Sequence, residues 1–507
     1  MSEKFYLTTP IYYVNDVPHI GHAYTTIAGD VLARYKRMMG HDVWYLTGTD
    51  EHGQKIWRAA EAAKEDPQAF VDKKADGFKE AWKILHISYD DFIRTTEPRH
   101  VKAVQEIFSK LLKQGDVYKG EYQGWYCVPC ESYWAEMELK EDPEGRKLCP
   151  DCGRATEILK EESYFFKLSK YQDQLLKHIE EHPGFIQPES RRNEIVQFIK
   201  QGLKDLSVTR TAFPWGIPLK EDPKHVIYVW FDALSNYITA LGYPNGEHFK
   251  KFWPVDAHLM GKEIVRFHAV TWPCMLLALG VPLPKKVFGH GWWTVEGKKM
   301  SKSKGNVVDP IALSREYGVD AVRYFLMREV PFGADGDFSI KHFIERFNAD
   351  LANDIGNLLN RTLTMVEKYF DGVVPEVENA KFDDTSKELV ALIGETPGMV
   401  DKLMDELAFS DALAAIWRLI NKANTYIEKE APWKAAKEGN TEKLGAIMYN
   451  LVDTLRAVAN LVSPFMPTTS QKMWGQLGFD GSPSFADANL SGVKIKKGEP
   501  LFPRLEK

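Results

Sequence analysis

The chain has 507 residues, enough at roughly 150 residues per domain for about three domains and more than one buried core. Its composition of 44% hydrophobic, 12% aromatic and 27% charged residues is that of a globular protein and excludes a disordered or fibrous chain. The net charge of −6, from 65 basic and 71 acidic residues, excludes a globally basic nucleic-acid binder, although a local basic surface is still compatible with it.

No segment is typical of a membrane span or of a secretory signal. The best uncharged run, residues 267–284, contains His268 and is interrupted by Pro273, Pro282 and Pro284. The N-terminus leads into a strand-like segment without a basic region followed by an apolar one. We therefore expect a cytoplasmic protein.

Residues 5–115 alternate between strand and helix patterns. Residues 5–9 are a β-rich run, followed by an expected polar, proline-containing loop. Residues 23–39 carry apolar side chains at helical spacing, and after Gly40 residues 43–47 form the next β-rich run. This βαβ order predicts a parallel sheet that binds ligands at the carboxyl ends of its strands.

The pattern changes over residues 116–225, where short apolar runs are mixed with glycine, proline and charged residues, as in an insertion. Strand-like runs resume at residues 226–231 and continue at 258–261 and 286–289, alternating with helical segments. The first sheet is therefore expected to be completed after this interruption.

Beyond about residue 345 the pattern is almost entirely helical. Apolar residues recur at helical spacing in several stripes, with breaks expected at Gly372, residues 397–398 and Gly439. An antiparallel helical bundle is the expected product.

Four of the five cysteines form two C-x2-C pairs, Cys127 with Cys130 and Cys149 with Cys152, and 18 residues separate the pairs. Two such turns can close a tetrahedron of thiolates around Zn²⁺, so the spacing favours a structural zinc over redox dithiols or coincidence. Four protein ligands leave no open position for catalysis, so the metal is expected to support the fold. Cys274, in an apolar stretch, is expected to be a buried small hydrophobe.

The segment P-H-I-G-H at residues 18–22 lies between a predicted strand and a predicted helix. Gly21 lets a ligand approach the backbone, and His19 and His22 flank it. The free amides and dipole of a helix start suit a polyphosphate, and imidazoles can donate hydrogen bonds to the same oxygens. A motif this short can also arise by chance.

Residues 298–306, K-K-M-S-K-S-K-G-N, place four lysines among small polar residues. Such a loop is suited to gripping phosphates, and its alternative interpretation is a solvated basic turn. The two motifs together, in this order, are far more specific than either alone.

The H-I-G-H and K-M-S-K-S pair resembles the signature of class I aminoacyl-tRNA synthetases, and within that class the chain is similar to methionyl-tRNA synthetases along nearly its whole length. The narrower similarity rests on residues 9–15 (T-P-I-Y-Y-V-N), 47–53 (T-G-T-D-E-H-G), 228–233 (Y-V-W-F-D-A) and 261–268 (G-K-E-I-V-R-F-H), on the four cysteines, on Asn357 and Arg361, and on residues 431–433 (A-P-W).

The resemblance implies an α/β fold with a Rossmann-type parallel-sheet catalytic domain split by a zinc-knuckle insertion and followed by an α-helical anticodon-binding bundle. The implied ranges are 1–115 for the first half of the catalytic domain, 116–225 for the insertion with the knuckle, 226–345 for the second half with the K-M-S-K-S and stem-contact region, and 346–507 for the bundle.

The implied reaction is activation of methionine by ATP, with Mg²⁺, to methionyl-adenylate and pyrophosphate, followed by transfer to the 2′-hydroxyl of the terminal adenosine of initiator and elongator tRNA(Met). Positioning and electrostatic stabilisation suffice for this chemistry. By match to the motifs, the catalytic residues are His19, His22, Lys299 and Lys302. Gly21, Gly261 and Glu263 join His19, His22 and Lys302 in ATP binding.

Methionine recognition must rely on shape and sulfur–aromatic contact, since a thioether offers no strong hydrogen bond. The resemblance places Pro10, Ile11, Tyr13, Trp230, Ala233, Leu234, Tyr237, Ile264, Phe267 and His268 around the side chain. Asp50 would pair with the substrate ammonium. Without the resemblance, the aromatic residues would be interpreted as ordinary core, and a solvated loop acid is the competing view of Asp50.

In the bundle, Asn357, Arg361, Pro432 and Trp433 match residues that read the CAU anticodon, since an indole and a guanidinium suit splayed bases. The alternative for Trp433 is packing between helices. The knuckle is expected near the entrance for the acceptor end, without touching the chemistry.

Departures from the family pattern are small. Glu263 stands where Asp is common, which weakens its expected ribose contact, and Leu234 replaces a Pro found in some members. One knuckle pair is present where other members have two. The chain stops at residue 507 without an additional dimerising or tRNA-binding domain, so a monomer is expected.

Three other classes compete with this interpretation. A small-molecule adenylyltransferase shares the sheet and a similar His motif, but is typically shorter and needs neither bundle nor knuckle. A non-catalytic, zinc-stabilised RNA-binding relative would not need His19, His22, Lys302 and Asp50 intact. Other class I synthetases, for branched amino acids, need an editing insertion larger than residues 116–225.

Overall fold

The structure is a computed structural model. It describes residues 2–14, 17–134, 136–299, 307–377, 383–481 and 490–506. The chain divides into two compact units: a sheet unit of Met1–Pro18, His41–Lys83 and Ile87–His290, and a helical unit of His19–Gly40, Ile84–His86 and Gly291–Lys507. The four domain ranges expected from the resemblance stay predictions.

The sheet unit is built on a six-stranded sheet in the order β3-β2-β1-β13-β14-β9, and every neighbouring pair in it is parallel. Its strands are β1 (Lys4–Tyr13), β2 (Asp42–Asp50), β3 (Asp91–Arg94), β9 (Ile186–Gln187), β13 (Ala257–Gly261) and β14 (Val287–His290). The strand order changes direction between β1 and β13, which is where open parallel sheets bind ligands. The predicted parallel α/β sheet, completed by strands from beyond the insertion, is confirmed.

Strand β1 is longer than predicted. It continues through Pro10 to Tyr13, where a loop was expected. The pairing of β1 with β2 shifts register between Thr8 and Ile11, and such a bulge accommodates a proline that cannot donate to the ladder.

The strand predicted at residues 226–231 is wrong for most of its length. Only β12 (Val226–Ile227) is extended, and it pairs with β11 (Thr209–Arg210) outside the main sheet. Residues from Val229 onward form the helix α7 (Val229–Leu234), whose side chains are all buried. A short apolar run without alternation does not distinguish a buried strand from a buried helix.

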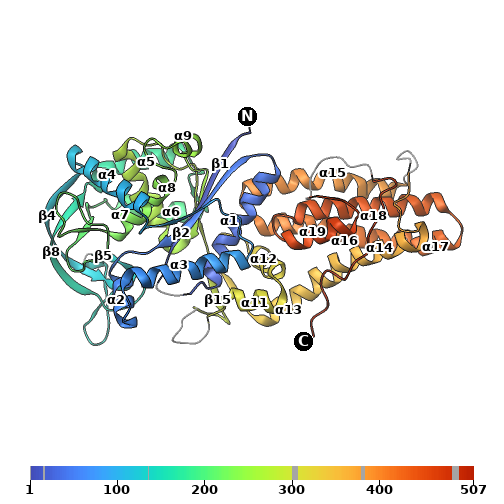
Figure 1. The fold of residues 1–507 in the computed structure, drawn as a ribbon, viewed down its shortest axis with the longest axis horizontal. Helices are drawn as coiled ribbons and strands as arrows, with labels where there is room; N and C mark the ends of the chain where they lie inside the picture. The colour runs from blue at the N-terminus through green and yellow to red at the C-terminus, as the bar shows by residue number, and fades with distance from the viewer. Residues whose placement is uncertain are drawn as a thin grey trace. The chain divides into compact units, whose positions relative to one another are not determined.

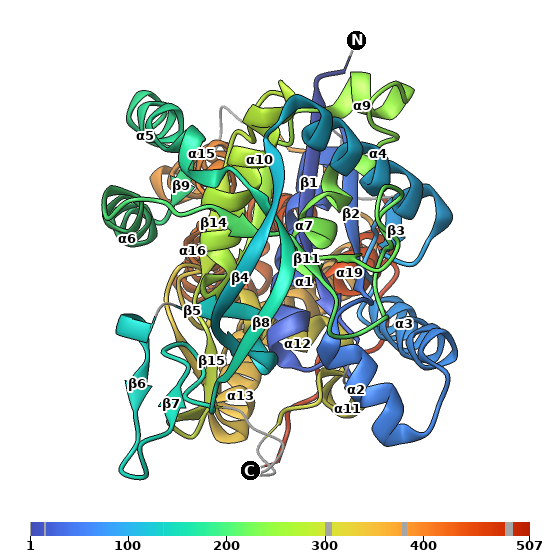
Figure 2. The ribbon, with the colours of Figure 1, turned by 90° about the vertical axis from the view of Figure 1, so that its left-hand side faces the viewer.

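The predicted insertion contains a long antiparallel ribbon. Figure 2 shows β4 (Val117–Cys127) and β8 (Glu157–Phe166) running side by side, with β6 (Lys140–Glu141) and β7 (Lys147–Leu148) forming a small hairpin beyond them. β5 (Ser132–Trp134) and β10 (Leu206–Ser207) complete a second sheet in the order β10-β8-β4-β5. The cysteine turns lie at the end of β4 and directly after β7.

The sheet unit contains further helices. They are α2 (Gln54–Ala63), α3 (Pro67–Ile84), α4 (Pro98–Gln114), α5 (Gln172–Glu181), α6 (Glu189–Lys200), α8 (Asn236–Thr239), α9 (Glu247–Phe252) and α10 (Trp272–Leu279), with short turns η1 (Val128–Cys130), η2 (Glu136–Glu138), η3 (Leu168–Tyr171), η4 (Lys262–Ile264) and the π-helical η5 (Phe267–Thr271). Of these, α4, α5, α6, α8, α9 and α10 contribute side chains to the main apolar core of the unit. Across the described parts of both units, none of the helices combines the length and apolar composition needed to span a bilayer.

The helical unit contains a bundle whose long helices lie side by side in Figure 1. Its helices are α1 (Ile20–Met38), α11 (Pro310–Tyr317), α12 (Val319–Arg328), α13 (Ile340–Arg346), the π-helical η7 (Phe347–Gly356), α14 (Asn357–Phe370), α15 (Asp384–Asp405), α16 (Phe409–Glu430), α17 (Pro432–Lys437), α18 (Thr441–Val462) and α19 (Pro467–Gln476). A small sheet in the order β16-β15-β17 also belongs to it, made of β15 (Trp293–Val295), β16 (Lys298–Lys299) and β17 (Gly336–Phe338).

The predicted helical C-terminal region is confirmed, and the breaks at Gly372 and Gly439 fall between helices. The break predicted at residues 397–398 is wrong, because α15 runs through Pro397. Packing of α15 against α16 and α18 outweighs the loss of one backbone donor.

Buried charges tie α1 into the helical unit. Arg323 of α12 donates to Asp30 of α1 at 2.6 Å, and neither side chain is exposed. The same guanidinium donates to the backbone carbonyls of Leu85, Pro464 and Phe465. This network satisfies the buried guanidinium and fixes the helix that carries the His motif.

Candidate functional site

Asp50 is the last residue of β2, at the carboxyl end of the sheet. Tyr13, the last residue of β1, is its partner across the strand pair, and Gly261 ends β13 on the other side of β1. These ends flank the point where the strand order reverses. The alternative interpretation of Asp50 as a solvated loop acid is wrong, since the residue is buried.

The environment of Asp50 disfavours its charged form. Burial raises the pKa of this carboxyl well above its ordinary value, and the nearby carboxylates of Asp232 and Glu131 raise it further. The backbone N–H of His52 acts in the opposite direction. Among the described residues, Asp50 Oδ1 has no hydrogen-bond partner. A buried carboxylate oxygen in this state is suited to a cationic ligand.

The neighbouring Glu51 is, by contrast, fully paired. Arg94 donates to both of its carboxylate oxygens, at 2.7 and 3.0 Å, and Thr49 and Thr96 donate one hydroxyl each. Trp215 Nε1 donates to its backbone carbonyl at 2.6 Å. No pattern in the sequence indicated this network, which holds the backbone on one side of Asp50 in place.

Aromatic rings next to this end of the sheet form one packed group. Trp230 stacks on Phe267 with centroids 3.8 Å apart and an angle of 5° between the rings. Tyr13 and His268 meet Trp230 edge-on, at 6.5 and 6.3 Å. The other side chains predicted to surround methionine lie near these in sequence and are buried or half-buried: Pro10, Ile11, Ala233, Leu234, Tyr237 and Ile264.

Many of these residues belong to the main apolar core, as the alternative interpretation expected. Two polar atoms in the group, Tyr13 Oη and Trp230 Nε1, are buried without a hydrogen-bond partner in the described part of the chain. Indole N–H groups of ordinary core residues, such as Trp82 and Trp417, share this state, so the position of the group at the carboxyl end of the sheet, rather than these two atoms, favours a binding site.

Tyr237 and His268 form a hydrogen-bonded pair within this group. His268 Nδ1 lies 3.0 Å from the Ile264 carbonyl, which can only accept, so the ring proton is on Nδ1. His268 Nε2 therefore accepts from the Tyr237 hydroxyl at 2.7 Å. Burial lowers the pKa of His268 to about 4, so the ring is neutral at pH 7. The group thus presents a neutral, polarisable surface.

Gly261 and Glu263 are adjacent at the end of β13. A Cβ atom on Gly261 would lie 2.4 Å from Glu263 Oε2, so only glycine allows the exposed carboxylate its observed position. The structure thus brings these two predicted ATP-binding residues together.

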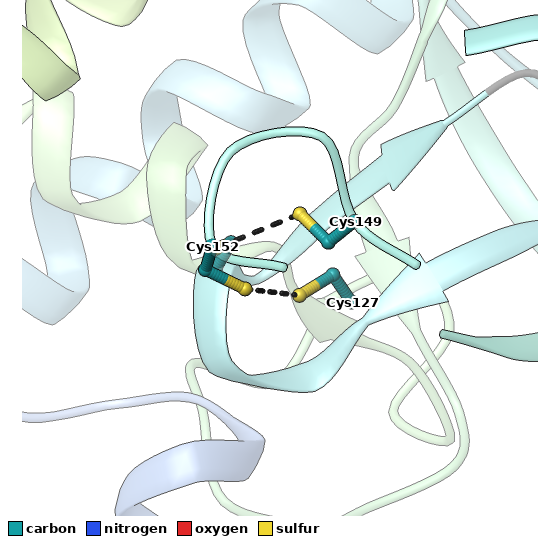
Figure 3. A group of neighbouring side chains, drawn as sticks. Cys127, Cys149 and Cys152 are labelled. Carbon is teal, nitrogen blue, oxygen red and sulfur yellow. Dashed lines mark hydrogen bonds between the residues drawn. The ribbon is translucent and has the colours of Figure 1, made fainter. Parts of the chain in front are cut away.

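The four cysteine sulfurs converge, as the spacing predicted. Figure 3 shows Cys127, Cys149 and Cys152 with their sulfurs turned toward one another, and all four sulfurs lie within 4.8 Å of one another. The Cys127–Cys152 and Cys130–Cys149 sulfur separations are 3.5 and 3.9 Å. A tetrahedron with Zn–S bonds of about 2.3 Å has edges of about 3.8 Å, so the four thiols fit a zinc ion.

Metal analysis of the purified protein is expected to return one zinc per chain. Cys149→Ser should reduce the zinc content to near zero, because serine is a poor zinc ligand. Cys274→Ala is the matched control. Cys274 is distant from the four cysteines in sequence and is buried in the main apolar core, so this variant should leave the zinc content unchanged. Iron in place of zinc, or a metal-free protein with oxidisable cysteine pairs, would contradict the assignment.

The knuckle also reaches the loop after β2. Glu131, which directly follows Cys130, accepts the backbone N–H of Lys55 at 2.9 Å and the Tyr126 hydroxyl. Gly53 has a φ of +102°, a backbone conformation that favours glycine, and a Cβ there would lie 2.9 Å from Glu131 Oε1. The sequence suggested no such contact, and the knuckle adjoins the Asp50 loop rather than only supporting the insertion.

His19 caps α1 in the helical unit, and the helix begins at Ile20, three residues before the predicted start. His19 Nδ1 accepts the Gly21 amide at 3.1 Å, and His22 Nδ1 accepts the His19 amide at 3.3 Å. The rings stack with centroids 3.8 Å apart. Because both Nδ1 atoms accept, each neutral ring carries its proton on Nε2, which makes both rings donors suited to phosphate oxygens.

Of the lysine motif, Lys302 lies outside the described residues, and only the backbone of Lys299, in β16, is described. Val308, which follows the lysine motif in the chain, contacts the His motif: its carbonyl accepts a hydrogen bond from the Ile20 amide at 3.2 Å. The fold therefore connects two segments that the sequence places far apart.

The candidate anticodon residues lie in the bundle. Asn357 begins α14 and is exposed, and Arg361, one turn later, donates to Glu428 of α16 at 2.6 Å. Pro432 is buried, whereas Trp433 is 41% exposed. The alternative that Trp433 packs between helices is therefore wrong. The Arg361–Glu428 contact joins α14 to α16, and Trp433 lies on α17, the short helix that directly follows α16.

Comparison with known families agrees with this geometry. Residues 5–363 match the family model "tRNA synthetases class I (M)", and residues 386–494 match "Anticodon-binding domain of tRNA ligase". The methionine–tRNA ligase of Caldanaerobacter subterraneus subsp. tengcongensis is 57% identical over 100% of this chain and 80% of its own length. That of Halalkalibacterium halodurans is 55% identical over 100% of this chain and 79% of its own length.

Among solved structures, Mycobacterium tuberculosis methionyl-tRNA synthetase in complex with methionyl-adenylate is similar to this chain. It has a TM-score of 0.96 and 42% identity, covering 99% of this chain and 100% of the other. A match along the whole chain, together with the fold and the sites described above, leaves one family: the chain belongs to the methionyl-tRNA synthetases of class I.

Proposed function

We propose that this protein is a methionine–tRNA ligase. It activates L-methionine with ATP to methionyl-adenylate and pyrophosphate, then transfers the methionyl group to the terminal adenosine of tRNA(Met). The observation that carries the proposal is Asp50: a buried carboxylate with one oxygen unpartnered among the described residues, at the ligand-binding end of the sheet and beside a neutral aromatic group. The names of the relatives support the same activity.

Asp50 would bind the substrate ammonium, which supplies the counter-charge that the carboxylate lacks. The thioether would lie against Trp230, Phe267 and the Tyr237–His268 pair. Sulfur–aromatic contacts of about 0.3–1.5 kcal/mol each favour a thioether there. The neutral state of His268 avoids placing a cation against an apolar substrate group.

Adenylate formation needs no side-chain nucleophile. A methionine carboxylate oxygen attacks the α-phosphorus of the ATP–Mg²⁺ substrate, the bond to the β-phosphate oxygen breaks, and pyrophosphate leaves. The Nε2–H groups of His19 and His22 would donate to phosphate oxygens, and Lys299 and Lys302 would neutralise the departing pyrophosphate. Glu263, beside Gly261, would contact the ribose.

Zinc would be held by Cys127, Cys130, Cys149 and Cys152, and would supply structural stability to the knuckle and the Glu131 contact. Asn357, Arg361, Pro432 and Trp433 would form the anticodon-binding surface. The cytoplasmic location and the monomeric state remain predictions from the sequence.

The proposal is tested by ATP–pyrophosphate exchange with each of the twenty amino acids. Methionine alone should stimulate exchange strongly. Equal stimulation by an aliphatic amino acid, or none by methionine, would overturn the proposal.

The anticodon surface has a separate test. Trp433→Ala is expected to leave methionine-dependent exchange unchanged and to lower the kcat/KM of aminoacylation about 10- to 100-fold, since stacking on one base contributes about 1–3 kcal/mol. Val390→Ala is the control in the bundle, because Val390 of α15 is a comparably exposed apolar residue outside the candidate anticodon surface. Loss of both steps in Trp433→Ala would count against an anticodon role.

A further inference from the structure

Asp232 lies at the centre of a buried chain of hydrogen bonds. Its Oδ2 atom is 2.7 Å from His52 Nδ1, and its Oδ1 atom is 2.6 Å from His100 Nε2. His100 Nδ1 is in turn 2.7 Å from Thr239 Oγ1. Because a carboxylate only accepts, both histidines donate to Asp232. These contacts join the loop after β2, α4, α7 and α8.

The neighbours of Asp232 in the chain give this network its functional meaning. Asp232 follows Trp230 by two residues and directly precedes Ala233, on the helix that supplies one wall for the methionine side chain. His52 follows Asp50 by two residues. The bond between Asp232 and His52 therefore connects the proposed ammonium-binding residue to the proposed side-chain wall.

Methionine carries its ammonium group and its side chain on one carbon atom. A site that recognises both must hold the two recognising elements at one fixed spacing. Among the described residues, no other hydrogen bond joins the 50–53 loop directly to α7. We propose that Asp232, through His52, is the positioning residue that sets the spacing between Asp50 and the Trp230 wall, and so couples ammonium binding to side-chain recognition.

The charge of Asp232 is consistent with this role. Burial acts to raise its pKa, but His52 and His100 outweigh burial and hold the pKa below its ordinary value. Asp232 is therefore ionised at neutral pH and acts on Asp50 as a like charge. The other titratable groups around Asp50 are Glu131 from the knuckle, Tyr13 of β1, Tyr237 of α8, Lys55 of α2, and Glu51 and His52 in its own loop.

The inference rests on the proposed function and is tested by the kinetics of methionine-dependent pyrophosphate exchange. Asp232→Asn is expected to raise the KM for methionine about ten-fold while the KM for ATP changes less than about two-fold. The acid limb of kcat/KM for methionine should also move to lower pH, because Asp50 loses a like charge. A merely destabilised protein would lose active enzyme, which lowers the apparent kcat and moves neither KM nor the pH profile.

Asp256→Asn is the matched control. Asp256 is a half-buried aspartate of the sheet unit, but it precedes β13 at the amino end of the strand and pairs with Lys4, Lys285 and the Tyr6 amide. It should leave both KM values unchanged. An unchanged KM for methionine in Asp232→Asn, or the same rise in Asp256→Asn, would overturn the inference.

If Asp232→Asn does not fold, two variants of His52 test whether the hydrogen bond to Asp232 sets the affinity for methionine. His52→Asn keeps a donor near the position of Nδ1 and should retain most of the affinity for methionine, whereas His52→Leu should show the rise in KM. Equal behaviour of the two would contradict the inference. The wild-type protein separates the two hypotheses: absence of methionine-dependent exchange in it refutes the proposed function, whereas normal exchange with unaffected variants refutes only the role of Asp232.

Discussion

Asp50→Asn is expected to abolish most methionine activation and, at the same time, to stabilise the unliganded protein. The pKa of Asp50 is raised by burial and by Asp232 and Glu131, so the folded state binds its proton more tightly than the unfolded state does. The stability that comes from the protonated form is lost as the pH rises through the folded-state pKa. At neutral pH the charged carboxylate therefore costs free energy, which asparagine removes.

At neutral pH, Asp50→Asn is expected to have a free energy of unfolding about 1–3 kcal/mol larger than that of the wild type. This difference becomes smaller as the pH falls, because Asp50 of the wild type is then protonated. The expected loss in kcat/KM for methionine is about 100- to 1,000-fold, as for removal of one partner of a buried charge pair. Thermal unfolding with and without methionine measures both effects. Methionine should raise the Tm of the wild type and leave that of Asp50→Asn unchanged.

Asp256→Asn again provides the contrast. Asp256 is half-buried and paired with two lysines, so its replacement should lower the Tm and leave the KM for methionine unchanged. An Asp50→Asn protein that is less stable than the wild type and retains its KM would show that Asp50 is a structural acid.

The second large effect is expected for Lys302→Ala. The pyrophosphate leaving group gains negative charge in the transition state, and the second lysine of K-M-S-K-S is the expected partner for that charge. Loss of one such group lowers rates by about 100- to 1,000-fold. Pyrophosphate exchange should fall by that factor, while methionine affinity measured by equilibrium binding stays near normal.

Lys304→Ala is the control for this variant. It removes the same charge from the same loop, one residue beyond K-M-S-K-S, so general electrostatic attraction of ATP changes equally in both variants. Unchanged exchange in Lys302→Ala, or an equal loss in Lys304→Ala, would refute a specific role for Lys302.

The elements that sequence reasoning predicted correctly are those whose signal is local. The cysteine turns depend on two-residue gaps, and the helix after the His motif depends on apolar spacing within one segment, although α1 begins at Ile20, three residues before the predicted start. Predictions failed where a local sequence pattern is compatible with two kinds of secondary structure. Residues 226–231 fit a strand and form mainly a helix, and Pro397 lies inside α15, because burial against neighbouring elements decided both.

The sequence by itself determined the chemistry available to this protein: a thiolate tetrahedron, a His-flanked helix start, a lysine-rich loop and a carboxylate at a strand end. Only the tertiary structure decided which of these groups act on one another. Asp50 gains its raised pKa from burial and from the nearby Asp232 and Glu131, and His52 meets Asp232 across 180 residues of chain. Such contacts are fixed by the packing of strands and helices around a common core, which no local pattern encodes.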